Sequence, residues 1–258
     1  MRIGYAAGDR EVAVEALKVL LDGGIVPVVL MVPQNARNVV DHMCKLVGPE
    51  VPVIWSGRRL SEAEMETLMR LRLDYLLSVH YPYVFSEDVL RVARIGGLNL
   101  HPAYLPWNRG WHTPSWAIIE GTPMGATLHW MVRDVDAGDI AFQTRVDPEP
   151  HDTAHSLYQK VLRAEIRLLA DAIPAMKAGT VPRRQTSESG TFHVKKDLEA
   201  IRRMDLNKKC RVGDVIDLLR ALTTNQPSEA AYFETNGRRY RVRIEIVPED
   251  GEATWSAE

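Results

Sequence analysis

The sequence predicts an α/β fold: a Rossmann-like, mostly parallel twisted sheet with helices on both faces, plus a small α+β carboxy-terminal unit ending in a β-hairpin. Short apolar runs alternate with helical patterns through the first half of the chain. This alternation is typical of a parallel sheet, and right-handed crossovers place its helices on both faces. The hairpin is indicated by an Asn236-Gly237 turn between two alternating runs, the strongest short-range hairpin signal.

The first half of the chain supplies four strands and three helices. Gly23-Gly24 ends the first helix, and Ser61 with Glu64 forms a capping box that opens the third. Pro27 suits only the start of its strand, because proline cannot donate a ladder hydrogen bond. The strands are expected at 3–7, 26–32, 51–55 and 75–79, and the helices at 10–22, 36–47 and 61–72.

The regular alternation of strands and helices ends after Pro82. A strand at 98–100 follows Gly96-Gly97 and ends in a polar, turn-rich run. A long amphipathic helix at 153–177 closes the main domain. Between them we expect a helix at 115–120 and strands at 125–132 and 140–147, with a short helix at 86–93 before the glycines.

The chain is expected to divide into four segments. Residues 1–180 form the main domain, and 181–190, rich in polar and turn-forming residues, form a linker. Residues 191–247 form the small carboxy-terminal unit, and 248–258 form an acidic tail. Within the small unit we expect two helices, at 195–204 and 212–222, before the hairpin at 230–247.

Composition excludes several classes of protein. Hydrophobic residues make up 45% and charged residues 26% of the chain, as in ordinary globular proteins. A net charge of −2 argues against a nucleic-acid binder. Cys44 and Cys210 show no metal-ligand spacing, and no apolar run has the ~20 residues that a membrane helix needs. We therefore expect a cytoplasmic protein with no metal and with neither nucleic acid nor membrane as partner.

Two stretches carry residues suited to chemistry. Asn99 and His101 lie two apart on an extended segment, so their side chains share one face. They stand at the carboxyl end of a strand, where α/β sheets bind ligands. Asp136 lies in a turn between two later strands, and Gly138 permits that turn to be tight. An amide, an imidazole and a carboxylate are thus expected at one end of the sheet.

These stretches and their neighbours resemble the formyltransferase family over residues 70–180, and earlier elements match in pattern only. The family includes methionyl-tRNA formyltransferase, glycinamide ribonucleotide transformylase and the sugar N-formyltransferases. The shared motifs are Asn99-Leu100-His101-Pro102, Leu105-Pro106, Arg109-Gly110, Trp116-Ala117-Ile118-Ile119, Gly121, Gly125, Thr127-Leu128-His129 and Val135-Asp136-Ala137-Gly138-Asp139-Ile140.

The resemblance implies N10-formyltetrahydrofolate as formyl donor and residues 1–180 as the catalytic domain. It implies a catalytic set of Asn99, His101 and Asp136, with Asp136 preferred over Asp139 because it comes first in the turn. An asparagine can donate to an oxyanion, a histidine can move protons near neutral pH, and a carboxylate can orient that histidine. The division of oxyanion and base roles between Asn99 and His101 stays open.

The same resemblance places the pterin ring of the donor against residues 78–85, with Tyr81, Tyr83 and Val84 as binding residues. His80 and His129 are expected to be structural. For the acceptor we expect Arg109, whose guanidinium can clamp a phosphate or a sugar hydroxyl, with Trp107 and with Gly8 in the turn after the first strand.

The acceptor is expected to be a primary amine on a nucleotide-linked deoxysugar, used for surface polysaccharide such as O-antigen, and the enzyme a homodimer. Methionyl-tRNA is an alternative, but residues 186–247 carry only a small positive excess, whereas phosphate contacts dominate tRNA affinity. Glycinamide ribonucleotide is another, but Asp9 and Glu11 would repel a phosphate at the helix start. A non-catalytic ligand-binding module is a further alternative. A nicotinamide oxidoreductase is disfavoured, because no Gly-x-Gly-x-x-Gly follows the first strand.

Overall fold

The computed structural model describes residues 1–186 and 189–249 and confirms the predicted α/β fold. A seven-stranded sheet has the order β3-β2-β1-β4-β5-β7-β8. The five strands on the β3 side run parallel, whereas β7 pairs antiparallel with both β5 and β8. The strands are β1 Ile3–Ala7, β2 Val29–Pro33, β3 Val53–Ser56, β4 Leu73–Val79, β5 Ala93–His101, β7 Gly125–Trp130 and β8 Ile140–Arg145.

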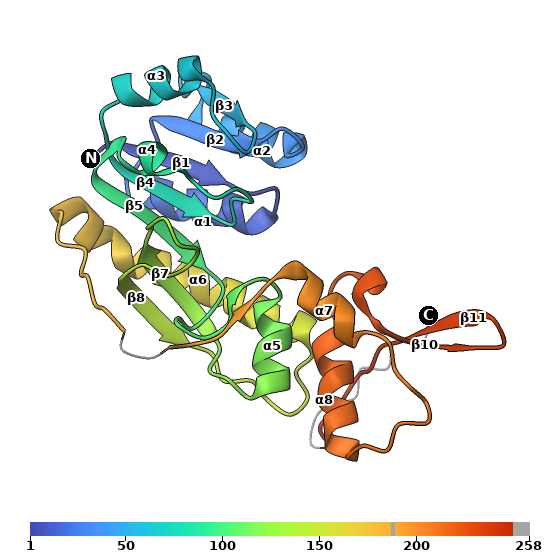
Figure 1. Ribbon diagram of the computed structural model, residues 1–258. Helices are drawn as coiled ribbons and strands as arrows, with labels where there is room; N and C mark the ends of the chain where they lie inside the picture. The colour runs from blue at the N-terminus through green and yellow to red at the C-terminus, as the bar shows by residue number, and fades with distance from the viewer. Residues whose placement is uncertain (187–188, 250–258) are drawn as a thin grey trace.

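Helices cover both faces of this sheet (Figure 1), and each face has its own hydrophobic core. One core joins the sheet to α1 (Glu11–Asp22), α2 (Arg37–Val47) and α6 (Ala154–Ala178). The other joins it to α3 (Glu62–Arg70) and α4 (Glu87–Leu90). Every residue of β1 is buried, as expected for a parallel strand covered on both sides.

One strand is much longer than the sequence suggested. The strand expected at 98–100 spans Ala93–His101, and the expected helix at 86–93 is correspondingly reduced to α4. Gly96 and Gly97 do not break the strand, because they make room for side chains on β7 and just after it. A Cβ on Gly96 would lie 2.9 Å from the Trp130 ring, and one on Gly97 would lie 2.6 Å from Met131.

The carboxy-terminal unit packs against α5 (Thr113–Glu120). It contains α7 (Lys195–Ile201), α8 (Val212–Leu222), a 3-10 turn at Pro227–Glu229 and the antiparallel strands β10 (Ala231–Thr235) and β11 (Arg238–Val242). Asn236 and Gly237 both have positive φ, as a two-residue type I′ turn requires, so the predicted hairpin is confirmed. It projects from the body of the molecule in Figure 1.

The segment expected as a linker follows the edge of the sheet. Arg184 forms an isolated antiparallel bridge with Ile140 of β8. Gly190 packs so closely on Pro106 that a Cβ there would lie 2.0 Å from the Pro106 carbonyl oxygen. Two short parallel strands, β6 (Arg109–Gly110) and β9 (Phe192–His193), then join the carboxy-terminal unit to the loop after β5. Residues 187–188 of the expected linker and 250–258 of the expected tail lie outside the described residues.

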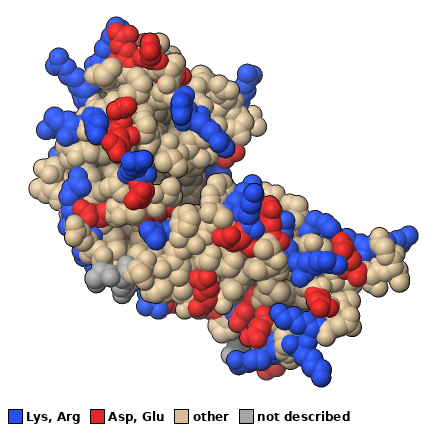
Figure 2. All heavy atoms as spheres, in the orientation of Figure 1, with Lys and Arg blue, Asp and Glu red and all other residues tan. Residues whose placement is uncertain are grey.

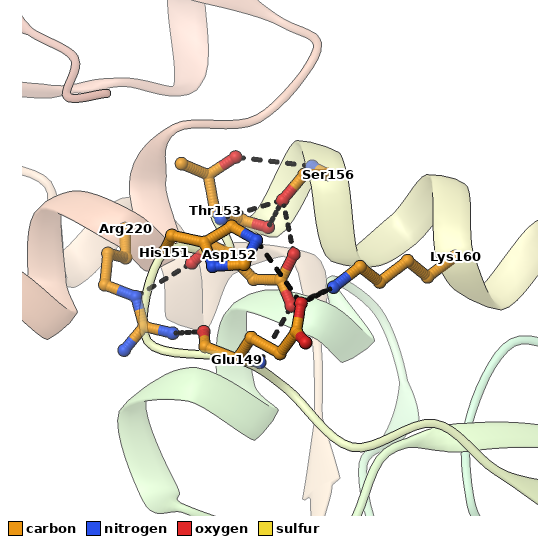
Figure 3. A network of polar contacts seen from close by, with 7 residues as sticks. All are labelled: Glu149, His151, Asp152, Thr153, Ser156, Lys160 and Arg220. Atoms are coloured by element: carbon orange, nitrogen blue, oxygen red, sulfur yellow. Dashed lines mark hydrogen bonds and ion pairs between the residues drawn. The ribbon is translucent and has the colours of Figure 1, made fainter. Parts of the chain in front are cut away.

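A polar network around the buried Asp152 ties α8 to the start of α6 (Figure 3). Arg220 donates to the backbone carbonyls of Asp152 at 2.8 Å and Glu149 at 2.7 Å. The fully buried Asp152 carboxylate accepts from Lys160 at 2.8 Å and from Ser156 at 2.9 Å. Burial alone would raise the pKa of Asp152, but Lys160 and the other donors hold that pKa below its usual range.

The same network contains a set of metal-type ligand atoms, on Glu149, His151 and Asp152. The Lys160 ammonium already pairs with two of these three side chains, so an ion-pair network accounts for the cluster.

Among the described residues, no helix is both long and apolar enough to cross a membrane.

Replacing Arg220 by methionine is expected to lower the free energy of unfolding by about 2–3 kcal/mol, because the backbone carbonyls of Asp152 and Glu149 lose their charged donor. The Arg220 side chain is only 12% exposed. The matched control is Arg70→Met in an ion pair on α3, where the arginine is 74% exposed and the loss should stay within about 1 kcal/mol. Urea unfolding measures both, and equal losses would contradict this account of the network.

Candidate active site

A cavity of about 780 Å³ lies at the carboxyl ends of β4 and β5, where the sequence predicted a site. Its wall includes the loop after β4, the loop after β5 and the turn that carries Asp136. The carboxy-terminal unit completes the wall with Phe192, Lys195, residues 224–226, Ser228 and Glu229. Both parts of the chain are therefore needed to enclose the site.

The three residues proposed as a catalytic set lie together in this cavity. Asn99 and His101 project from the end of β5, and Asp136 returns toward them from the turn between β7 and β8. The Asn99 amide nitrogen lies 3.4 Å from Asp136 Oδ1, and His101 Nε2 lies 3.5 Å from Asp136 Oδ2. His101 Nε2 is buried and makes no hydrogen bond within the described chain, so the Asp136 carboxylate is the charged group that stands beside it.

The backbone at Asp136 is shaped to hold the carboxylate in place. Asp136 has φ of 51°, a left-handed conformation that aspartate tolerates better than most residues. The Gly110 N–H donates to Asp136 Oδ2 at 3.2 Å. Gly138 passes so close to β7 that a Cβ would lie 1.8 Å from the Trp130 carbonyl oxygen. Asp139, three residues after Asp136, lies beside Arg183 instead, with its Oδ2 4.0 Å from a guanidinium nitrogen.

His129 is the main site residue that sequence reasoning missed, because it was expected to be structural only. Strand pairing sets it opposite Asn99. Its Nδ1 lies 3.0 Å from the Trp130 carbonyl oxygen, which can only accept, so Nδ1 carries the proton. In the neutral ring Nε2 is then an acceptor for the Asn99 amide, at 3.1 Å. His129 Nε2 also lies 3.4 Å from Asp136 Oδ1.

Burial sets the charge states of the central pair. It lowers the pKa of His101 below the usual value near 6.5, against the opposing effect of the Asp136 carboxylate. For Asp136, burial alone would raise the pKa, but His101, His129 and the Gly110 N–H together hold it well below its usual range. At neutral pH the site thus holds a neutral imidazole beside a charged carboxylate.

The residues proposed for the donor lie on the loop after β4. Tyr81, Tyr83 and Val84 all line the main cavity and also a second cavity of about 830 Å³. Tyr81 is fixed by stacking on Phe85 at 4.8 Å and by a hydrogen bond to the Ser56 hydroxyl. Val84 is 62% exposed. The second cavity also contains three exposed arginines, Arg58, Arg59 and Arg133.

The residues proposed for the acceptor do not line the main cavity. The Arg109 guanidinium lies 6.0 Å from the centre of the Phe192 ring, and half-buried Trp107 donates its backbone N–H to Tyr104. Gly8 packs beneath His80, where a Cβ would lie 2.1 Å from the His80 carbonyl oxygen. Their neighbours Asp9, Arg10, Gly110 and Trp111 line the cavity instead.

Comparison with known proteins identifies the class. Residues 13–173 match the model of the formyl transferase family, and residues 197–248 match the dimerisation carboxy-terminal domain of N-formyltransferases. The first match covers more than half of the chain, and the chain belongs to the formyl transferase family. The resemblance drawn from its motifs is confirmed.

Three individual proteins of known sequence or structure are similar to this chain. A dTDP-4-amino-4,6-dideoxyglucose formyltransferase from Mycobacterium tuberculosis is 32% identical over 178 residues, which are 69% of this chain and 75% of that protein. A 4-N formyltransferase structure from Francisella tularensis superposes with TM-score 0.82 at 21% identity, covering 95% and 98% of the two chains. An N-formyltransferase from Helicobacter canadensis, in complex with folinic acid and dTDP-3-aminofucose, gives TM-score 0.69 at 18% identity, with 92% and 85% covered.

Asp136→Asn is expected to lower the pKa of His101 further, because the carboxylate is the group that stabilises the imidazolium against burial. The imidazole signal of His101, assigned by its loss in His101→Gln, can be followed by NMR from pH 4 to 8. This titration needs no substrate, so the amine's own ionisation does not enter. An unchanged or higher pKa in Asp136→Asn would contradict the electrostatic coupling.

Proposed function

We propose that this chain transfers a formyl group from N10-formyltetrahydrofolate to the primary amine of a nucleotide-linked amino deoxysugar. The observation that carries the proposal is the buried cluster of Asn99, His101 and Asp136, which faces a cavity at the carboxyl ends of β4 and β5 in a member of the formyl transferase family. One relative is named as a formyltransferase of dTDP-4-amino-4,6-dideoxyglucose, and another is described in complex with dTDP-3-aminofucose. Both compounds are nucleotide-linked amino sugars.

The chemistry assigns a task to each residue. The amine nitrogen attacks the formyl carbon, and the carbonyl oxygen becomes an oxyanion that the Asn99 amide stabilises by donating a hydrogen bond. The long contact of that amide to Asp136, at 3.4 Å, is weak enough to be exchanged for the oxyanion. His101 takes a proton from the amine and returns one to N10 of the folate as the carbon–N10 bond breaks. Asp136 stabilises the imidazolium formed between these transfers.

The donor is proposed to span the two cavities that share the loop after β4. Its pterin ring would lie in the main cavity against residues 81–85, close to His101. The glutamate carboxylates of its tail would lie in the second cavity, where Arg58, Arg59 and Arg133 supply positive charge. The donor's reactive end would then meet the acceptor at the catalytic cluster.

The acceptor is proposed to enter from the carboxy-terminal side of the main cavity. Trp111 is 50% exposed there, and the Lys195 ammonium lies 5.6 Å from its ring centre. A flat aromatic surface beside a cation suits a nucleotide's base and diphosphate. Figure 2 shows basic and acidic side chains intermixed over the carboxy-terminal unit, which favours this small acceptor over tRNA.

A homodimer is proposed to form through the carboxy-terminal unit, which matches a dimerisation domain. The β10–β11 hairpin projects from the body of the molecule (Figure 1), and residues 238–241 of β11 are exposed, so this strand is available to a second copy. Tyr232 and Phe233 of β10 are half-buried, and Phe233 stacks on Tyr240 of β11 at 5.4 Å.

The decisive test is a mass-spectrometric assay with N10-formyltetrahydrofolate and a panel of acceptors. The panel holds dTDP-, UDP- and GDP-linked 3- and 4-amino sugars, glycinamide ribonucleotide and methionyl-tRNA. We expect one nucleotide sugar to gain the mass of a formyl group in place of hydrogen, with a dTDP-linked 4-amino sugar tested first because of the mycobacterial relative. Formylation of glycinamide ribonucleotide or methionyl-tRNA alone would overturn the proposed acceptor.

His101→Asn and Asp136→Asn are each expected to reduce turnover by about 100- to 10,000-fold, the usual contribution of a positioned acid or base. Circular dichroism should show an unchanged fold. The matched control is His42→Asn on α2, whose side chain is 45% exposed, and it should turn over normally. Near-normal turnover in either site variant would refute the assigned roles.

A further inference from the structure

Glu165 of α6 is a fully buried carboxylate that the chemistry above does not use. Its hydrogen-bond partner within the described chain is His80, whose Nε2 lies 2.9 and 3.1 Å from the two carboxylate oxygens. Burying a charged carboxylate without a hydrogen-bond partner strongly lowers the stability of a folded protein. The pair joins the middle of α6 to the residue that follows β4, at the wall of the main cavity.

The Glu165–His80 pair is one end of a series of hydrogen-bonded side chains that continues through Tyr158 to Arg10. The other ring nitrogen of His80, Nδ1, lies 3.2 Å from the Tyr158 hydroxyl. Burial raises the pKa of Tyr158 to about 12, so its hydroxyl keeps the proton to donate. The Tyr158 oxygen accepts in turn from Arg10 at 2.8 Å. Arg10 and Glu165 therefore stand at opposite ends of one series of hydrogen-bonded side chains.

The backbone at His80 is held in an unusual conformation. Its φ of 52° is left-handed, a conformation that residues with a side chain adopt rarely. Gly8 packs on the peptide that follows, since a Cβ there would lie 2.1 Å from the His80 carbonyl oxygen. Gly8 also donates its N–H to the Val79 carbonyl at 3.0 Å. His80 is thus fixed through its backbone by Gly8 and through its imidazole by Glu165.

The direction of the next residues depends on that conformation. Tyr81, Tyr83 and Val84, which line both cavities, follow His80 directly. Val79 pairs with Leu100, so His80 stands beside His101 at the end of the sheet. A rotation at His80 would therefore redirect the loop close to the reacting atoms. Strained conformations persist where the surrounding structure holds them, and they cluster at ligand sites.

We propose that Glu165 is a positioning residue: through its hydrogen bonds to His80 it holds the left-handed turn that aims residues 81–85 at the folate donor. The inference rests on the proposed function, because it takes this loop to be the donor site. Glu165 itself touches neither substrate. Its loss should weaken donor binding and leave acceptor binding intact, whereas a merely structural carboxylate would change stability alone.

The test measures binding of folinic acid by calorimetry, first to the wild-type protein and then to Glu165→Gln, which keeps the size of the side chain. We expect the Kd to rise by about 10- to 100-fold, the effect of a small misplacement in a site. The KM of the amino-sugar acceptor, measured at saturating donor, should stay within about twofold. His80→Gln should raise the Kd for folinic acid to a similar extent. The double variant should bind folinic acid no more weakly than either single variant.

The matched control is Asp152→Asn, which also changes a fully buried carboxylate bonded to its neighbours (Figure 3). It should lower the melting temperature and leave folinic acid binding unchanged. If Glu165→Gln does not fold, the folinic acid affinities of His80→Gln and Asp152→Asn are compared instead, and only His80→Gln should bind more weakly than the wild type.

Wild-type affinity for folinic acid in Glu165→Gln or His80→Gln would overturn the proposal. So would additive effects in the double variant, or equal losses of donor and acceptor affinity. Failure of the wild-type protein to bind folinic acid would instead overturn the proposed donor, and with it the role of the loop.

Discussion

The site depends above all on the antiparallel pairing of β5 with β7, which sets Asn99 opposite His129 and His101 opposite Thr127. This register brings the turn after β7 back over the end of β5, where Asp136 meets both β5 side chains. A shift of one residue would turn every side chain of β7 to the other face. Gly96, Gly97 and Gly138 give the strands and the turn the close approach that the pairing needs.

The burial that this packing produces also sets the chemistry. Desolvation disfavours charge on His101, whereas two imidazoles and a backbone N–H favour charge on Asp136. The outcome is a neutral imidazole beside a fixed anion, which suits the proton transfers proposed for His101. His129 adds a third contact, because its tautomer, fixed by the Trp130 carbonyl, orients the Asn99 amide. Four side chains from two strands and one turn therefore act as a unit.

Two polar networks organise the surroundings of this unit. Arg220 fastens the carboxy-terminal unit to the start of α6, and that unit supplies part of the cavity wall. Further along the same helix, Glu165 reaches His80 beneath the loop after β4. α6 is therefore the common support for the side of the cavity proposed for the acceptor and the side proposed for the donor. Its length allows a single rigid element to serve both.

The sequence by itself determined the order of the elements, the hairpin and the face shared by Asn99 and His101, because periodicity, capping and turn chemistry are local. It also indicated that Gly138 would permit a tight turn at Asp136. Only the tertiary structure decided that His129 joins the cluster and that Glu165 pairs with His80. It also decided that the main cavity is lined by residues 224–226, Ser228 and Glu229 and not by Arg109 or Trp107. These contacts join residues far apart in the chain. Sheet register and helix packing determine them, and neither leaves a periodic signal in the sequence.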